Sequence, residues 1–174
     1  MLEKGNVGII NALGTGVADD KAVYSYVNKM IVYYLGEQPI LNQVETFLCE
    51  DKVHRQHVIE NISKLVVKPA NASGGYGIMI GPKAPKKERE EVIKKIKKNP
   101  RDFVAQPLEI LSTTPTISEN GIEPRHLDLR PFVLNGKSTY VTTGGLTRVA
   151  LRKGSTIVNS SHGGGSIDTM VVDT

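Results

Sequence analysis

The order of apolar and polar residues along the chain predicts three helices. Apolar residues recur every three or four positions in the stretch 19–36, which Asp19 can cap and Gly36 can end. The same spacing recurs in 51–62 and, as a narrow apolar stripe, in the strongly basic stretch 83–101. We therefore expect amphipathic helices in all three places.

Short apolar runs bounded by glycine and proline predict strands, most of them in hairpins. The runs LVVKP and IMIG enclose a glycine-dense tip and predict a hairpin over 64–81. A strand is expected in DFVAQPLEI, a hairpin over 125–141 that turns at Asn135-Gly136, and a short strand within 5–16. Because helices and hairpins follow one another in mixed order, we expect an α+β fold rather than a doubly wound sheet.

Length and composition limit the class of protein. The 174 residues, of which 39% are hydrophobic, suffice for one domain with a core or for two small subdomains that share a hinge. No run of apolar residues is long enough for a membrane span, and the first residues do not read as a signal peptide. The single cysteine, Cys49, excludes an intrachain disulfide and fits a reducing cytoplasm, where we expect the protein.

The net charge of +4 invites a nucleic-acid interpretation, but the excess is local. Residues 83–101 hold nine Lys and Arg against three Glu, which leaves the rest of the chain slightly acidic. No aromatic residue interleaves with these lysines, whereas Glu90–Lys94 and Glu91–Lys95 are spaced for pairs along a helix. A solvated helix face is favoured over a nucleic-acid-binding patch, which stays open as an alternative.

Lys68 ends a buried-looking strand just before the glycine-dense tip. Its ammonium, with backbone N–H groups left open by Gly74, Gly75 and Gly77, would suit a polyphosphate. The pattern is not a Walker loop, because the lysine precedes the glycines. On spacing alone, an ordinary hairpin tip and a phosphate-binding loop are both open.

The alternating stretch after residue 125 places three polar side chains on one face of a strand. His126, Asp128 and Arg130 alternate with leucines, so their side chains point the same way. A carboxylate and a guanidinium directed into one site could hold Mg²⁺ and a transferring phosphoryl group. The alternative is a solvent-facing ladder of ion pairs.

Taken in order, five sequence blocks resemble the circularly permuted ATP-grasp proteins. The blocks are NALGTGVADDK, LVVKPANASGGYGIMIGP, AQPLEILSTTPT, RHLDLRPFVL and GGLTRVALRKGSTIVNSSHGGGSIDT. Each block alone is weak, but five in the right order, from about Asn11 to Asp173, are specific. The resemblance turns the glycine-dense tip into an expected lid over phosphates.

The resemblance also implies roles for individual residues. The residues expected to contact ATP are Lys21, Lys68, Gly74, Gly75, Tyr76, Gly77, Gln106, Pro107, Leu108 and His126. The two lysines would meet the phosphates, the segment from Gln106 to Leu108 would read the adenine edge, and His126 would lie near the ribose. Asp128 and Asn159 match positions that hold Mg²⁺, while Arg130 and Arg148 match catalytic positions facing the γ-phosphate or an acyl phosphate.

The implied function is the nucleotide-binding portion of an ATP-dependent carboxylate–amine ligase that works through an acyl phosphate. Its substrates would be a small-molecule or peptide carboxylate and an amine. The resemblance implies an N-terminal helical segment, 1–64, a lid subdomain, 65–106, and a core sheet subdomain, 107–174, around a nucleotide cleft. The chain looks like the C-terminal portion of a longer protein, whose sheet edge could pair with a second copy.

One departure supports a different class of function. Many ATP-grasp enzymes place a glutamate two residues before the metal-binding asparagine, and this chain has Ile157 there. A catalytically inactive ATP-grasp module, used for binding or assembly, is therefore the alternative. A nucleic-acid-binding module that uses the 83–101 helix is a third.

Overall fold

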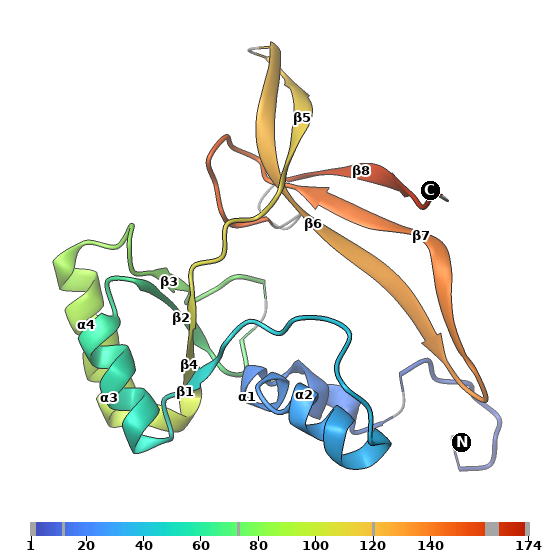
Figure 1. The fold of residues 1–174 in the computed structure, drawn as a ribbon, viewed down its shortest axis with the longest axis horizontal. Coiled ribbons are helices and arrows are strands. Elements are labelled where there is room, and N and C mark those ends of the chain that lie inside the picture. Colours follow the sequence, from blue (N-terminus) through green and yellow to red (C-terminus); the bar gives the residue numbers. More distant parts are fainter. Residues whose placement is uncertain (1–2, 12, 73, 120, 159–163, 173–174) are drawn as a thin grey trace. The chain divides into compact units, whose positions relative to one another are not determined.

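The computed structural model describes residues 3–11, 13–72, 74–119, 121–158 and 164–172, and it divides into two compact units (Figure 1). The first unit is Met1–Leu108 and the second is Glu109–Thr174. Helices and antiparallel strands share the first unit, whereas the described secondary structure of the second is all strand. The α+β fold class predicted from the sequence is confirmed. Among the described residues, no helix is long and apolar enough to cross a membrane.

The first unit is built on a four-stranded antiparallel sheet in the order β1-β4-β2-β3. The strands are β1 (Phe47–Leu48), β2 (Leu65–Pro69), β3 (Met79–Ile80) and β4 (Phe103–Pro107). Val66 faces Ile80 across β2 and β3, which confirms the predicted hairpin. The central pair, β2 and β4, carries Lys68 on one strand and Gln106 on the other.

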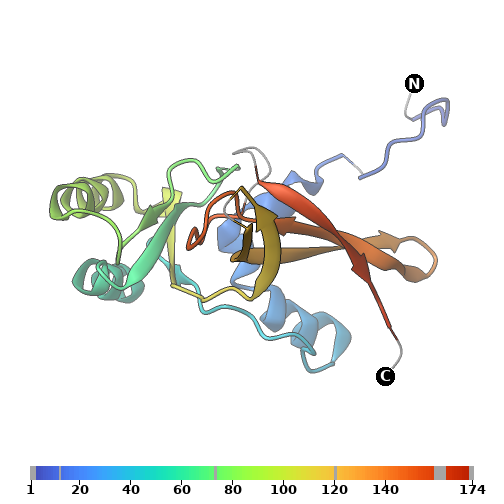
Figure 2. The same ribbon diagram turned by 90° about the horizontal axis from the view of Figure 1, so that it is seen from above.

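Two helices cover one side of this sheet (Figure 2). Asp51 caps α3 (Lys52–Asn61) by accepting from the His54 amide at 2.8 Å, and α4 (Lys86–Lys98) ends before Pro100, as predicted. Their buried residues Val58 and Ile96 enter the core. The other buried members of that core are Cys49, Ile62, Leu65, Val67, Met79 and Ala105. The 3₁₀-helix η3 (Pro100–Asp102) connects α4 to β4.

The N-terminal segment differs from its prediction. The strand expected within 5–16 is wrong, because the described residues there form turns and bends that lead into η1 (Thr15–Asp19). The single helix expected over 19–36 is divided into α1 (Lys21–Tyr24), α2 (Val27–Met30) and the π-helix η2 (Ile31–Leu35).

Local hydrogen bonds explain both the division and the cap. The Ser25 hydroxyl donates to Ala22 O at 2.7 Å, and such a bond competes with continued helix. Asp20, rather than Asp19, caps α1. Gly36 ends η2 with a φ of 67°, in the left-handed region that glycine favours, as predicted.

The second unit is a four-stranded antiparallel sheet whose strands follow chain order (Figure 2). They are β5 (Thr113–Ser118), β6 (Gly121–Asn135), β7 (Thr139–Val149) and β8 (Gly165–Met170). Asn135 pairs with Thr139, so the turn spans three residues, and the two-residue turn predicted at Asn135-Gly136 is wrong. The Thr139 hydroxyl donates to the Asn135 side chain at 2.9 Å, which ties the strand ends together in this register.

Candidate functional site

Lys21 and the glycine loop of the first unit lie around one depression. Lys21 is the first residue of α1, and its ammonium donates to Ala72 O at 2.5 Å. The depression has a volume of about 450 Å³. Its lining is Asp19, Lys21, Pro69, Asn71, Ala72, Gly74, Gly75, Tyr76 and Ile78. Four residues predicted to bind ATP, Lys21 and the segment Gly74–Tyr76, are therefore brought together.

The backbone of this loop requires glycine. Gly74, Gly75 and Gly77 have φ values of 68°, 79° and 73°, which L side chains rarely adopt. A Cβ on Gly77 would also lie 2.9 Å from Pro69 Cγ, closer than real carbon contacts allow. Backbone N–H groups in turns are known to form concave sites that bind anions.

Lys68 points its ammonium at Gln106 on the neighbouring strand. Lys68 Nζ donates to Gln106 Oε1 at 2.6 Å, and Gln106 Nε2 donates in turn to Thr46 Oγ1 at 2.8 Å. Burial and, secondarily, the charge of Lys21 lower the pKa of Lys68. The positive charge of Lys21 therefore disfavours the protonated form of Lys68, and an anion bound near both ammonium groups would reduce this repulsion.

The segment predicted to read adenine ends strand β4. Pro107 pairs with Leu65 in the sheet, and Leu108 follows as the last residue of the first unit. The Gln106 side chain accepts a hydrogen bond from Lys68, so it holds the ammonium in place. Adenine recognition by this segment stays a prediction.

The second unit holds the other group of predicted residues around one carboxylate. Asp128 on β6 pairs with Arg148 on β7 in the strand register. Arg148 donates from Nε to Asp128 Oδ1 at 2.9 Å and from Nη2 to Oδ2 at 2.5 Å, while Arg130 Nη2 lies 3.3 Å from Oδ2. The pKa of Asp128 is lowered, chiefly by the hydrogen bond from Arg148. His126 is turned aside and hydrogen-bonds through Nδ1 to Leu111 O at 2.8 Å.

This arrangement does not by itself fit a magnesium ion. Both oxygens of Asp128 already accept from guanidinium groups, so a metal would have to displace them. Across the residues that the structure describes, no three His, Cys, Asp or Glu side chains gather as metal ligands would. Asn159, the other predicted ligand, lies outside the described residues.

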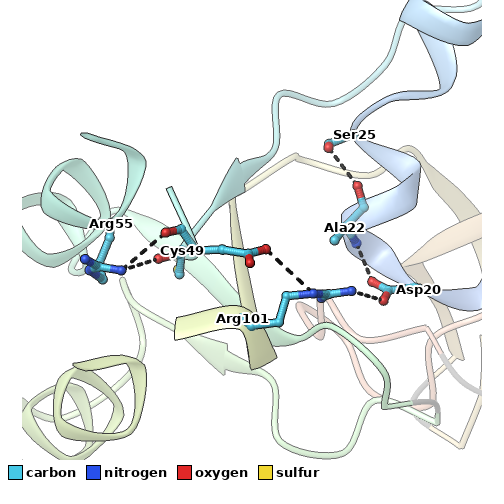
Figure 3. A network of polar contacts seen from close by, with 7 residues as sticks. Asp20, Ala22, Ser25, Cys49, Arg55 and Arg101 are labelled. Carbon is cyan, nitrogen blue, oxygen red and sulfur yellow. Dashed lines mark hydrogen bonds and ion pairs between the residues drawn. The ribbon is translucent and has the colours of Figure 1, made fainter. Parts of the chain in front are cut away.

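Sequence reasoning missed an ion pair that holds the start of α1 (Figure 3). Asp20 accepts from the Ala22 amide at 2.8 Å with one oxygen and from Arg101 Nη2 at 2.7 Å with the other. An acid before a helix is a recognisable capping signal. Nothing in the sequence pattern connects it with Arg101, which belongs to η3.

Comparison with known proteins identifies several relatives of this chain. It is 53% identical over 170 residues to an uncharacterized protein of Synechocystis sp., covering 97% of this chain and 35% of that protein. It is 52% identical over 169 residues to an uncharacterized protein of Mycobacterium tuberculosis, covering 97% and 31%. A Frankia casuarinae protein named "Putative glutamate--cysteine ligase 2-2" is 50% identical over 165 residues, covering 95% and 19%.

The chain thus spans about a third or less of the length of these relatives. The profile of one family, circularly permuted ATP-grasp type 2, matches residues 1–150. That match includes the glycine loop, both lysines and the carboxylate of Asp128 with its arginine partners. The chain belongs to the circularly permuted ATP-grasp type 2 family.

Proposed function

We propose that the first unit binds the phosphates of ATP at the depression between Lys21 and the glycine loop. The observation that carries this proposal is the shared lining, in which an ammonium and the glycines Gly74 and Gly75 border the same space. An ammonium and the backbone N–H groups of a glycine loop both bind phosphate oxygens. A volume of about 450 Å³ is within the usual size of small-molecule sites.

Lys68 would supply the second positive charge. Its pKa is lowered chiefly by burial and secondarily by the charge of Lys21. A polyanion placed between Lys68 and Lys21 would therefore be attracted by both, and would raise the pKa of Lys68 on binding. Tyr76 and Gly77, which we propose as the rest of the lid, continue the same loop.

For the whole protein we propose an ATP-dependent carboxylate–amine ligase. Family membership supports ATP use, and the name of the Frankia relative supports ligation of an acid to an amine. In the proposed reaction a substrate carboxylate oxygen attacks the γ-phosphorus and ADP leaves. The amine nitrogen then attacks the acyl carbon, the amide bond forms, phosphate leaves and the nitrogen loses a proton.

The arginines of the second unit have a proposed part in this reaction. Arg148 is held by two hydrogen bonds to Asp128, and Arg130 by one, so both guanidinium groups are oriented before substrate arrives. We propose that they neutralise the transferring phosphoryl group or the acyl phosphate. We likewise propose that the chain is divided into segments 1–64, 65–106 and 107–174, and that the protein is cytoplasmic.

Calorimetry with Mg·ATP tests phosphate binding. We expect micromolar to millimolar affinity for the 174-residue chain, weakened about 10-fold or more by Lys21→Ala and by Lys68→Ala, since each removes a charged hydrogen bond. Lys94→Ala, which removes an exposed lysine from α4, is the matched control and should bind as the unsubstituted chain does. No binding, or equal loss in the control, would contradict the proposed site.

A catalytically inactive binding module is the second candidate. It is favoured by the carboxylate of Asp128, whose two oxygens are engaged by arginine, and by Ile157 at the position where a glutamate is common in the family. ADP release that requires both an acid and an amine would support the ligase. Nucleotide binding without ADP release, across a panel of acids and amines, would support the binding module.

A further inference from the structure

Three segments of the first unit meet at Ala70, which directly follows β2 and is fully buried. The amide of Lys21 donates to Ala70 O at 3.0 Å. The amide of Ala70 donates to Asp102 O at 2.8 Å. The start of α1, the entrance to the glycine loop and the end of η3 are thereby joined through one residue. We call this the Ala70 junction.

An ion pair between Arg101 and Asp20 joins the same segments through side chains (Figure 3). Arg101, next to Asp102, donates to Asp20, next to Lys21, at 2.7 Å. The Asp20 side chain is only 13% exposed, so the pair is protected from solvent on the acidic side. The hydrogen bond from Arg101 is the largest cause of the lowered pKa of Asp20. Glu50 lies farther from Arg101, at 3.7 Å.

The helix that carries Lys21 cannot hold its position unaided. Helix α1 has four residues, well below the length at which a helix is stable in water without tertiary contacts. At its start α1 is anchored by the Asp20 cap, by two bonds from Lys21 to Ala70 and Ala72, and by the contact of Asp20 with Arg101. At its end, Tyr24 is hydrogen-bonded to Gln43 and Val44. Release of Arg101 would leave the cap in place but would free it to move with α1.

We propose that Asp20 and Arg101 are positioning residues that hold the Lys21 ammonium against the glycine loop, so that the phosphate site is formed before the nucleotide arrives. This inference rests on the proposed phosphate function. Neither residue needs to touch the nucleotide. Their effect reaches it through the Ala70 junction, which sets where Lys21 begins and where the loop departs from the sheet. Preorganisation of this kind improves affinity by reducing the ordering cost of binding.

Two substitutions separate the ion pair from the helix cap. Arg101→Gln removes the charge, and Asp20→Asn keeps a capping oxygen while removing the negative partner. Both should weaken Mg·ATP binding about 5- to 20-fold, and Arg101→Lys should restore part of the loss. Arg89→Gln is the matched control, because it removes one arginine of the same unit that donates instead to Gly81 O.

A double-mutant cycle decides whether the pair acts through Lys21. If it does, Arg101→Gln should have little further effect in a Lys21→Ala background. Full additivity would overturn the inference, and so would unchanged affinity in both Arg101→Gln and Asp20→Asn. If the unsubstituted chain binds no Mg·ATP, the proposed function itself fails and takes the inference with it.

Amide hydrogen exchange provides a readout without nucleotide. In Arg101→Gln, the amides of Lys21 and Ala22 should exchange faster, while the amides of Val66 and Val67 within the sheet keep their protection. Unchanged exchange at Lys21 would overturn the inference. If sheet amides also lose protection, the Arg101→Gln variant is unfolded. The same measurement on Asp20→Asn then decides the question: faster exchange at Lys21 supports the inference, and unchanged exchange overturns it.

Discussion

Gln106→Leu is the substitution that most directly tests how Lys68 is held. Leucine is similar in size but offers no acceptor, so the ammonium that lies 2.6 Å from Gln106 Oε1 loses its partner while staying partly buried. Hydrogen bonds to charged groups contribute about 1.5–3 kcal/mol each. We expect the first unit to lose about 2 kcal/mol of unfolding free energy at neutral pH, within that range.

The loss should depend on pH in a defined direction. The bond stabilises the protonated form of Lys68, so its contribution is present below the folded-state pKa and is lost as pH rises through it. Gln106→Leu should lower the pKa of Lys68 further than burial and Lys21 already do. Gln106→Glu should raise it, because a carboxylate favours the charged ammonium.

Urea denaturation followed by helical circular dichroism measures the stability, since the described helices all lie in the first unit. With a slope of about 1–3 kcal/mol per molar urea, the midpoint should fall by roughly 1 M. The pKa of Lys68 can be followed by titrating ¹³C-labelled lysine in NMR spectra. Thr46→Val is the control, because it removes the second bond of Gln106 and a bond from Thr46 to Val44 O but leaves the bond from Lys68 to Gln106 intact. An unchanged pKa in Gln106→Leu would refute the assignment of Gln106 as the lysine's partner.

Three further predictions concern packing, charge and reactivity. Gly81→Ala would place a Cβ 1.9 Å from Ile62 O, and should lower the free energy of unfolding by about 1–3 kcal/mol in urea titrations. Asp128→Asn should destabilise the second unit at neutral pH but not in strong acid, because the stability that comes from the lowered pKa of Asp128 is lost as pH falls through that pKa. Hydrogen exchange of the β7 amides measures the stability of this unit. Burial raises the pKa of Cys49 to about 11, so the thiol should react with Ellman's reagent at neutral pH only at the rate of unfolding. Rapid labelling of the folded chain would contradict that burial.

The elements that the sequence predicted well are those whose signals are local. Helices α3 and α4 have their caps, periodicity and stop residues within their own segments, and the β2–β3 hairpin has its glycine tip between its strands. The segment 5–36 was predicted less well. Its first part has the apolar spacing of a strand, but its described residues have no strand partner and form turns and bends. Its second part has the spacing of one long helix, but the Ser25 hydroxyl bonds to Ala22 O and the helix is divided there.

The sequence by itself determined the α+β class and the basic helix, because apolar periodicity and cap residues act within short stretches of the chain. The need for glycine in the loop after Lys68 followed from the positive φ values of the structure. Only the tertiary structure decided the partners of the charged groups. Arg101 meets Asp20 across 81 residues, Lys68 meets Gln106 across 38, and Arg148 meets Asp128 across 20. Such pairs form because sheet register and core packing bring distant segments together, and residue spacing carries no record of that.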